Sequence, residues 1–236
     1  MSALLSGETL EHFSPRSQYI FDASGNIVGL QNPRAVGADF RPIMPMTWAE
    51  RPTVNIPPAL FLFTDIGSSG TLMRYAGSRW RPLAGQAMLA SLGATVTGIT
   101  NTETIFLQTL IPAGAWQTND LIRITVAGAK SGATDIGVFT VRVGTAGTTA
   151  DTSVFATTAM SAAGRTYGTV KDLKLTSATN SQDVPVYTGV SSSALLAAVA
   201  ISNASSNALY VSLSWTSGGT TDTISALTGT ILLITP

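Results

Sequence analysis

The chain of 236 residues contains no cysteine and a single histidine, His12. Without cysteine, neither a disulfide bond nor a thiolate ligand for a metal can form. The only histidine lies in the N-terminal stretch, so a Ser-His-Asp triad in the body of the chain and a site built from several histidines are both excluded. We therefore expect no cofactor and no bound metal, and we interpret His12 as an exposed side chain.

Charged residues are also scarce, at 11% of the chain, against about 25% in an ordinary soluble domain. The 13 basic and 13 acidic residues cancel to a net charge of zero, and no lysine occurs before Lys130. Binding to a nucleic-acid backbone requires clustered Lys and Arg, so we predict that nucleic acid is not a partner. Thr, Ser, Gly and Ala take the place of charges, and such a surface suits packing against other protein surfaces.

Long apolar runs are missing as well. The longest spans residues 194–201, far short of the ~20 residues that cross a bilayer. The first 13 residues lack the basic segment followed by an apolar run that is typical of a signal peptide. We therefore predict no membrane insertion, and synthesis in a cytoplasm without export.

Acidic side chains are the remaining candidates for catalysis, because two carboxylates can hydrolyse a glycosidic bond. The carboxylates of the C-terminal part are Glu103, Asp120, Asp135, Asp151, Asp172, Asp183 and Asp222. All but Asp172 lie in or beside turn-like segments, where Asp caps and bends the chain. The glycine-rich segment 144–147 lacks the Lys of a phosphate-binding loop and is interpreted as a hairpin turn. We expect no catalytic residue and no enzyme activity.

What the sequence does contain is a succession of short apolar or alternating segments separated by turns. Alternation with a period of two, rich in β-branched residues, predicts strands. No segment combines a 3.6-residue period with matched helix caps, although residues 83–92 are ambiguous. We predict an all-β protein in three parts: an N-terminal extended arm with a hairpin at 1–46, a small β-hairpin module at 47–90, and a C-terminal antiparallel β-sandwich at 91–236.

The first part has many prolines and too little apolar surface to fold alone. Two short apolar strands, 19–21 and 27–30, flank a turn-forming segment, which is typical of a hairpin. We interpret this part as an anchoring arm that becomes ordered on a partner protein. The apolar side chains that would be buried on that partner are Tyr19, Phe21, Ile27 and Leu30.

The second part contains the most distinctive cluster of side chains, in the predicted strand 79–82. Arg79 and Arg81 should point to one side of this strand and Trp80 to the other. One hypothesis is a stacking platform for a sugar or for an aromatic side chain of a partner. The alternative, which we favour, is that Trp80 closes a very small core while the two arginines face water.

The third part carries at least eight candidate strands. Leu209, Val211, Leu213 and Trp215, with Ser212 and Ser214 between the last three, show the alternation clearly. The turn-rich spacing predicts a jelly-roll-like sandwich. Two runs, 195–201 and 230–234, are apolar at consecutive positions, so they would expose apolar surface on the outer face of a sandwich. We therefore predict self-association through these faces. The candidate strands are 104–110, 121–126, 138–143, 154–160, 167–175, 184–188, 195–201, 209–215 and 230–234.

Several segments resemble structural proteins of tailed bacteriophages. The hairpin 21–30 (FDASGNIVGL) resembles sequences near the N-terminus of fibre and adaptor-bound proteins. The segments 48–52 (WAERP), 64–67 (TDIG) and 75–82 (YAGSRWRP) are similar to a short module that recurs in phage tail proteins. The segments 111–114 (IPAG) and 119–124 (NDLIRI) look like phage C-terminal jelly-roll domains.

This resemblance implies a location in the virion and a homotrimer whose C-terminal lobes surround a three-fold axis. It also implies attachment to another virion protein, on the tail or the head, through the N-terminus. A long fibre shaft would need repeats or a coiled coil, and the sequence contains neither. The resemblance therefore implies a short tail fibre or a fibre-anchoring protein, with a distal lobe that contacts a host-surface glycan or another fibre protein.

Three other functions remain open at this point. A head-decoration or head-fibre protein on the capsid would need the same arm and sandwich. A depolymerase belongs to a different class and is disfavoured by the sparse chemistry. A free carbohydrate-binding module would be expected to have more aromatic residues than the 7% present.

Overall fold

The computed structural model describes residues 9–12, 14–21, 27–31, 43–53, 60–76, 79–99, 101–132, 134–156, 166–184 and 198–235. Within these residues the chain forms eighteen strands in four sheets and one short 3-10 turn, η1 (Trp48–Glu50), and it has no α-helix. The all-β prediction is therefore confirmed. No helix among these residues is long and apolar enough to cross a membrane.

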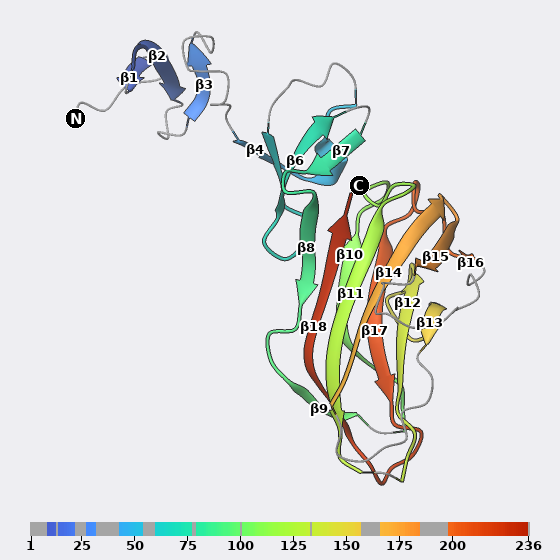
Figure 1. Cartoon of the computed structure of the whole chain (residues 1–236). Helices are drawn as coiled ribbons and strands as arrows, with labels where there is room; N and C mark the ends of the chain where they lie inside the picture. The colour runs from blue at the N-terminus through green and yellow to red at the C-terminus, as the bar shows by residue number, and fades with distance from the viewer. Residues whose placement is uncertain are drawn as a thin grey trace.

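Two sheets face each other in the C-terminal sandwich (Figure 1). The larger sheet has the order β16-β15-β14-β11-β18-β8, with β9 also paired to β18. Its strands are β8 (Gln86–Ser91), β9 (Val96–Ile99), β11 (Leu121–Lys130), β14 (Thr166–Ser177), β15 (Asn180–Val184), β16 (Val199–Ala200) and β18 (Ile224–Ile234). The smaller sheet has the order β10-β17-β12-β13. Its strands are β10 (Thr104–Ile111), β12 (Val138–Gly144), β13 (Thr152–Ala156) and β17 (Leu209–Thr216).

The connectivity of this sandwich is that of a jelly roll. Strand β8 pairs with β18, β10 with β17, β11 with β14, and β12 with β13, all antiparallel. Among these eight strands the first therefore pairs with the last, the second with the seventh, the third with the sixth and the fourth with the fifth. This is the order of a long hairpin that is rolled into two sheets. Strands β15 and β16 extend the larger sheet beyond β14. The predicted jelly-roll-like sandwich is thus confirmed.

The sandwich core follows from the alternation of the strands. On β11, Ile122, Ile124 and Val126 are buried and alternate with partly exposed neighbours. They share one continuous cluster with Leu213 and Trp215 from β17 of the facing sheet. Burying each aliphatic side chain of this kind contributes roughly 1.5–3 kcal/mol, so these rows hold the two sheets together.

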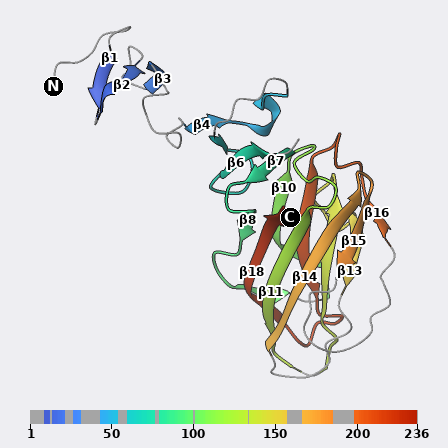
Figure 2. The same cartoon turned by 45° about the horizontal axis from the view of Figure 1, so that its top comes forward.

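A separate four-stranded sheet, called the small sheet below, lies at one end of the sandwich, beside the start of β8 (Figures 1 and 2). Its strands are β4 (Ile43–Met46), β5 (Leu60–Phe63), β6 (Thr71–Ala76) and β7 (Arg79–Pro82). Strand β4 runs parallel to β5, and the remaining pairs are antiparallel. Gly67, with φ +76°, lies in the turn after β5, and a Cβ there would lie 2.2 Å from the carbonyl oxygen of Met88. Only glycine allows this turn to press so closely on β8.

The N-terminal sheet consists of β1 (Thr9–His12), β2 (Ser14–Phe21) and β3 (Ile27–Gln31) in a simple antiparallel order. The predicted hairpin is present as β2 and β3, with Tyr19 opposite Leu30 and Phe21 opposite Ile27. The turn between these strands, residues 22–26, lies outside the described residues. The four proposed anchor residues therefore occupy facing register positions on two paired strands.

Strand β8 differs from the expectation. The sequence leaves residues 83–92 ambiguous between helix and strand, and most of these residues belong to the small module that it predicts. The structure instead places Gln86–Ser91 in the larger sandwich sheet, paired with Thr230–Ile234 of β18 and with an irregularity between Ile231 and Leu232. The sandwich thus begins at Gln86. Residues 157–160 of the candidate strand 154–160, residues 185–188 of 184–188 and residues 195–197 of 195–201 lie outside the described residues.

Candidate functional site

The predicted cluster on β7 is divided between two environments. Trp80 is 5% exposed and lies against three aromatic rings of its own sheet. Its ring centroid is 5.0 Å from that of Phe61, 5.2 Å from that of Phe63 and 5.4 Å from that of Tyr75, all edge-on. A ligand could stack on Trp80 only if this core opened. The geometry therefore favours the structural role for Trp80 over the stacking platform.

The two arginines beside Trp80 face the sandwich and act on one buried carboxylate. Arg79 Nη1 lies 3.2 Å from Asp120 Oδ1 and donates to the carbonyl of Thr118 at 3.4 Å. The positive charges of Arg79 and Arg81 both act on Asp120, but its burial dominates and raises its pKa to about 6. Thus Arg79 and Arg81 help to join the small sheet to the sandwich, which differs from the expectation that they face water alone.

Asp120 belongs to a tight turn that precedes β11. Its Oδ2 accepts a hydrogen bond from the backbone N–H of Gln117 at 3.0 Å, and Asn119 adopts a left-handed conformation with φ 75°. Asn tolerates this conformation better than most residues. The backbone carbonyl of Asp120 accepts from the indole N–H of Trp116 and from the N–H of Leu175 on β14. The turn is therefore fixed on several sides.

Trp48 forms a second connection between the small sheet and the sandwich. Its indole Nε1 donates to the carbonyl of Ala113 at 2.7 Å, and its backbone N–H donates to Asp65 Oδ1 at 2.8 Å. The guanidinium of Arg51 lies 4.3 Å from the centre of the Trp48 ring. Sequence reasoning did not assign a role to Trp48. The local signal was the spacing of Thr47 and Glu50, which form a capping box around η1.

Three carboxylates of the sandwich, Glu103, Asp151 and Asp172, are engaged inside the protein. Glu103 makes a bidentate ion pair with Arg142, at 2.8 and 2.7 Å, and this pair lowers the pKa of Glu103. Asp172 makes a bidentate pair with Arg123 at 2.8 and 2.7 Å. Asp151 instead accepts hydrogen bonds from the backbone of residues 146–148. Each of these groups is held by a cation or by a turn.

Asp135 and Asp222 are the two carboxylates that come together. The backbone N–H of Asp135 donates to Asp222 Oδ2 at 2.8 Å, and Asp135 Oδ2 accepts from the N–H of Thr221 and of Asp222. Lys130 Nζ lies 2.5 Å from Asp222 Oδ2 and also donates to the carbonyl of Gly132. Lys130 thus compensates the charge of Asp222, while Asp135 is held by backbone N–H groups. Among the described residues, no group of three or more acidic or histidine side chains is arranged to hold a metal ion.

An apolar area covers part of the outer face of the larger sheet. Met88 on β8 lies opposite Leu232 on β18, and Ile234 lies beside Leu121 on β11. Met88 is 47% exposed, and the other three are partly exposed. We call these four residues the outer apolar row. They show that the final strand is apolar on both faces, as the sequence indicated.

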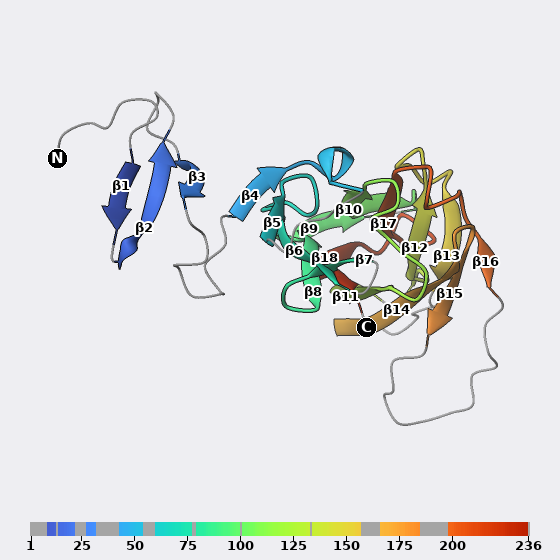
Figure 3. The same ribbon diagram turned by 90° about the horizontal axis from the view of Figure 1, so that it is seen from above.

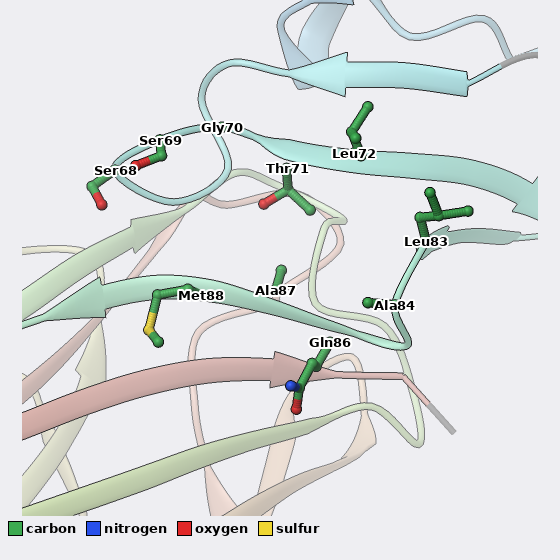
Figure 4. A pocket seen from close by; sticks show the side chains of 10 residues that line it. All are labelled: Ser68, Ser69, Gly70, Thr71, Leu72, Leu83, Ala84, Gln86, Ala87 and Met88. Carbon is green, nitrogen blue, oxygen red and sulfur yellow. The ribbon is translucent and has the colours of Figure 1, made fainter. Parts of the chain in front are cut away.

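A hollow of 360 Å³ lies next to Met88, between the turn that precedes β6 and the start of β8 (Figure 4). Its wall includes Gly70, Leu72, Leu83 and Ala87. Leu83 is 46% exposed. The hollow is lined by small, apolar or uncharged polar side chains, and none of its lining residues is charged.

Figure 3 views the fold from above, with the small sheet beside the end of the jelly roll. These features define the class as a jelly roll with a small β-sheet docked at one end. No family model and no curated protein matches the sequence. Among solved structures, a chain in "Structure of infectious bursal disease virus Gx strain" has 9% sequence identity and a TM-score of 0.24, over 64% of this chain and 40% of that chain. That TM-score is too low to establish a shared fold.

Proposed function

We propose that this protein is a non-enzymatic structural component of a virus particle, and specifically a short tail fibre or fibre-anchoring protein of a tailed bacteriophage. The observation that carries the proposal is a jelly roll with a low content of charged residues, in which Glu103, Asp172 and Asp222 are held by internal cations and Asp151 by backbone N–H groups. A surface of this kind suits permanent contact with other protein surfaces. Jelly rolls also serve other functions, so the tail assignment rests on the phage-like segments of the sequence.

The same engagement of the carboxylates supports the absence of hydrolase activity. A glycosidase needs two carboxylates that face a substrate across an open site, one of them able to donate a proton. Glu103 and Asp172 are each held in a bidentate pair with arginine, and Asp222 is held by Lys130. The pairing with Arg142 lowers the pKa of Glu103 and the pairing with Lys130 lowers the pKa of Asp222, which makes these two carboxylates poor general acids.

Attachment through the N-terminus is the second element of the proposal. The hairpin of β2 and β3 carries Tyr19, Phe21, Ile27 and Leu30 at facing positions. An apolar hairpin of this size gains stability by packing on a partner, because a small sheet alone buries little surface. We propose that the partner is another virion protein, at the tail adaptor or baseplate. The distal end of the jelly roll would then be free to contact a host-surface glycan or another fibre protein.

Self-association as a trimer is the third element. The outer apolar row is bordered on the same face by Lys174 and by the mutually compensated Arg123–Asp172 ion pair. Because the chain as a whole has a net charge of zero, little repulsion separates two copies. A closed symmetric contact would remove this row from water without leaving a further surface for uncontrolled assembly. A trimer follows from the phage resemblance, while a dimer would satisfy the same physical requirement.

We expect the full chain to have three times the monomer mass by light scattering at micromolar concentration. Leu232→Glu should shift it to the monomer, because the new charge would be buried in the contact. Leu110→Glu is the matched control, since Leu110 is 44% exposed on the outer face of the smaller sheet, and this variant should remain a trimer. A wild-type monomer would refute self-association, and a wild-type dimer would refute the three-fold arrangement.

A further inference from the structure

The contact between the small sheet and the sandwich contains a carboxylate in an unusual position. Asp120 has no exposed surface, although it lies where two parts of the protein meet. Its Oδ2 is satisfied by the Gln117 N–H, but Oδ1 accepts no hydrogen bond of good geometry from the described residues. An ionised carboxylate that is removed from water in this way is costly unless its charge is fully compensated.

The available compensation is partial. Arg79 and Arg81, both on β7, are the charged groups that act on the Asp120 carboxyl. The nearer contact, from Arg79 Nη1 to Oδ1, is 3.2 Å, longer than the 2.7–2.9 Å of a strong charge-assisted hydrogen bond. The other element packed on this turn, β14, contacts it through the backbone of Leu175. Desolvation of Asp120 therefore outweighs the attraction of the two arginines.

We propose that this contact, between β7 and the turn 117–120, is a proton-stabilised joint, which packs most firmly when Asp120 carries a proton. If the joint opens, Asp120 meets water and regains an ordinary affinity for protons. The packed state then binds the proton more tightly than the open state, so acid favours packing.

The direction of the pH dependence follows from the pKa of Asp120, which is about 6 in the packed state against an ordinary value of 3.8. A carboxyl group with a raised pKa stabilises the packed state fully below pH 3.8, and this stabilisation is lost as the pH rises through about 6. Between pH 5 and pH 8 the opening equilibrium of the joint should change by about tenfold. The small sheet would thus be held firmly on the jelly roll in mild acid and more loosely at neutral pH.

The joint can be tested by amide hydrogen exchange of the full chain between pH 5 and pH 8, corrected for the intrinsic exchange rate. We expect peptides covering 79–82 to be about tenfold more protected at pH 5 than at pH 8. Peptides from β17, inside the sandwich, serve as the internal control and should not show this change. The sequence also contains one histidine, His12, a residue type that ordinarily ionises in this range, so the change must also be assigned by mutation.

Two variants make that assignment. Asp120→Asn retains an oxygen that can accept from the Gln117 N–H but cannot ionise, and it should abolish the pH dependence at 79–82. Arg79→Gln removes a cation that lowers the pKa of Asp120, and it should move the midpoint to higher pH. The proposal is overturned if wild-type protection at 79–82 is flat between pH 5 and pH 8, or if Asp120→Asn leaves the pH dependence intact.

Discussion

Replacing Lys130 by alanine is expected to lower the Tm at pH 7 by roughly 10 °C, as for the loss of one partner from a buried ion pair. Lys130 ends the inward row of β11 and is 3% exposed, and Asp222, directly before β18, is also 3% exposed. Lys130 Nζ lies 2.5 Å from Asp222 Oδ2. Without the lysine, the Asp222 carboxylate would remain buried with backbone N–H partners alone. Thermal unfolding followed by circular dichroism measures the change.

Lys174→Ala provides the matched control for this prediction. Lys174 lies on the neighbouring β14 and is only partly buried, so its loss should change the Tm by no more than a degree or two. The hydrogen bond from Lys130 is the largest cause that lowers the pKa of Asp222 below 3.8, and the hydrogen bond from the Asp135 N–H is the next largest. The contribution of the Lys130–Asp222 pair to the stability of the fold is therefore present above pH 3.8 and lost in stronger acid. Equal Tm values for Lys130→Ala and the wild type would contradict the structural role of the pair.

Trp80→Ala is expected to reduce the free energy of unfolding of the small sheet by about 3–5 kcal/mol. Trp80 is at the centre of the aromatic cluster with Phe61 and Phe63, and a sheet of four short strands has few other large side chains to replace it. Denaturant unfolding, combined with hydrogen exchange of β5 and β6, would locate the loss in this sheet.

The matched control is Tyr75→Ala on the adjacent strand β6. Tyr75 touches Trp80 but is 38% exposed, so the variant should lose about 1 kcal/mol or less. The stacking hypothesis for Arg79, Trp80 and Arg81 makes the opposite prediction. Under that hypothesis, Trp80→Ala would fold with normal stability and lose binding to an oligosaccharide.

The strands of the sandwich were the most predictable part of the fold. Segments such as 121–126 and 209–215 alternate cleanly because the apolar side chains of one face pack in the core. On β17, however, Ser212 and Ser214 of the other face are buried as well. Strand β8 was the least predictable, since its irregular pairing with β18 breaks the alternation and Ala87 and Ala90 are compatible with a helix. Its assignment depends on β18, which lies about 140 residues away and which no local pattern reveals.

The arginines of β7 show where sequence reasoning about the site ends. Alternation correctly placed Arg79 and Arg81 on the face opposite Trp80. It could not identify their partner, because Asp120 belongs to a distant turn and reaches β7 only when the small sheet packs on the sandwich.

The carboxylates gave a similar result. The turn position of Asp120, Asp135 and Asp151 was evident, but Asp183, expected in or beside a turn, lies within β15. Ion pairs such as Glu103 with Arg142 and Asp222 with Lys130 depend on tertiary structure.

The position of this protein in an intact particle tests the proposed function most directly. Under the proposed function a phage encodes this chain, so particles of that phage should be purified, probed with gold-labelled antibodies against the sandwich, and examined by electron microscopy. We expect label at the tail, at the site where fibres attach, and a copy number in purified particles that is a multiple of three. Label confined to the capsid would refute the fibre assignment, and absence of the protein from purified particles would contradict a structural role in the virion.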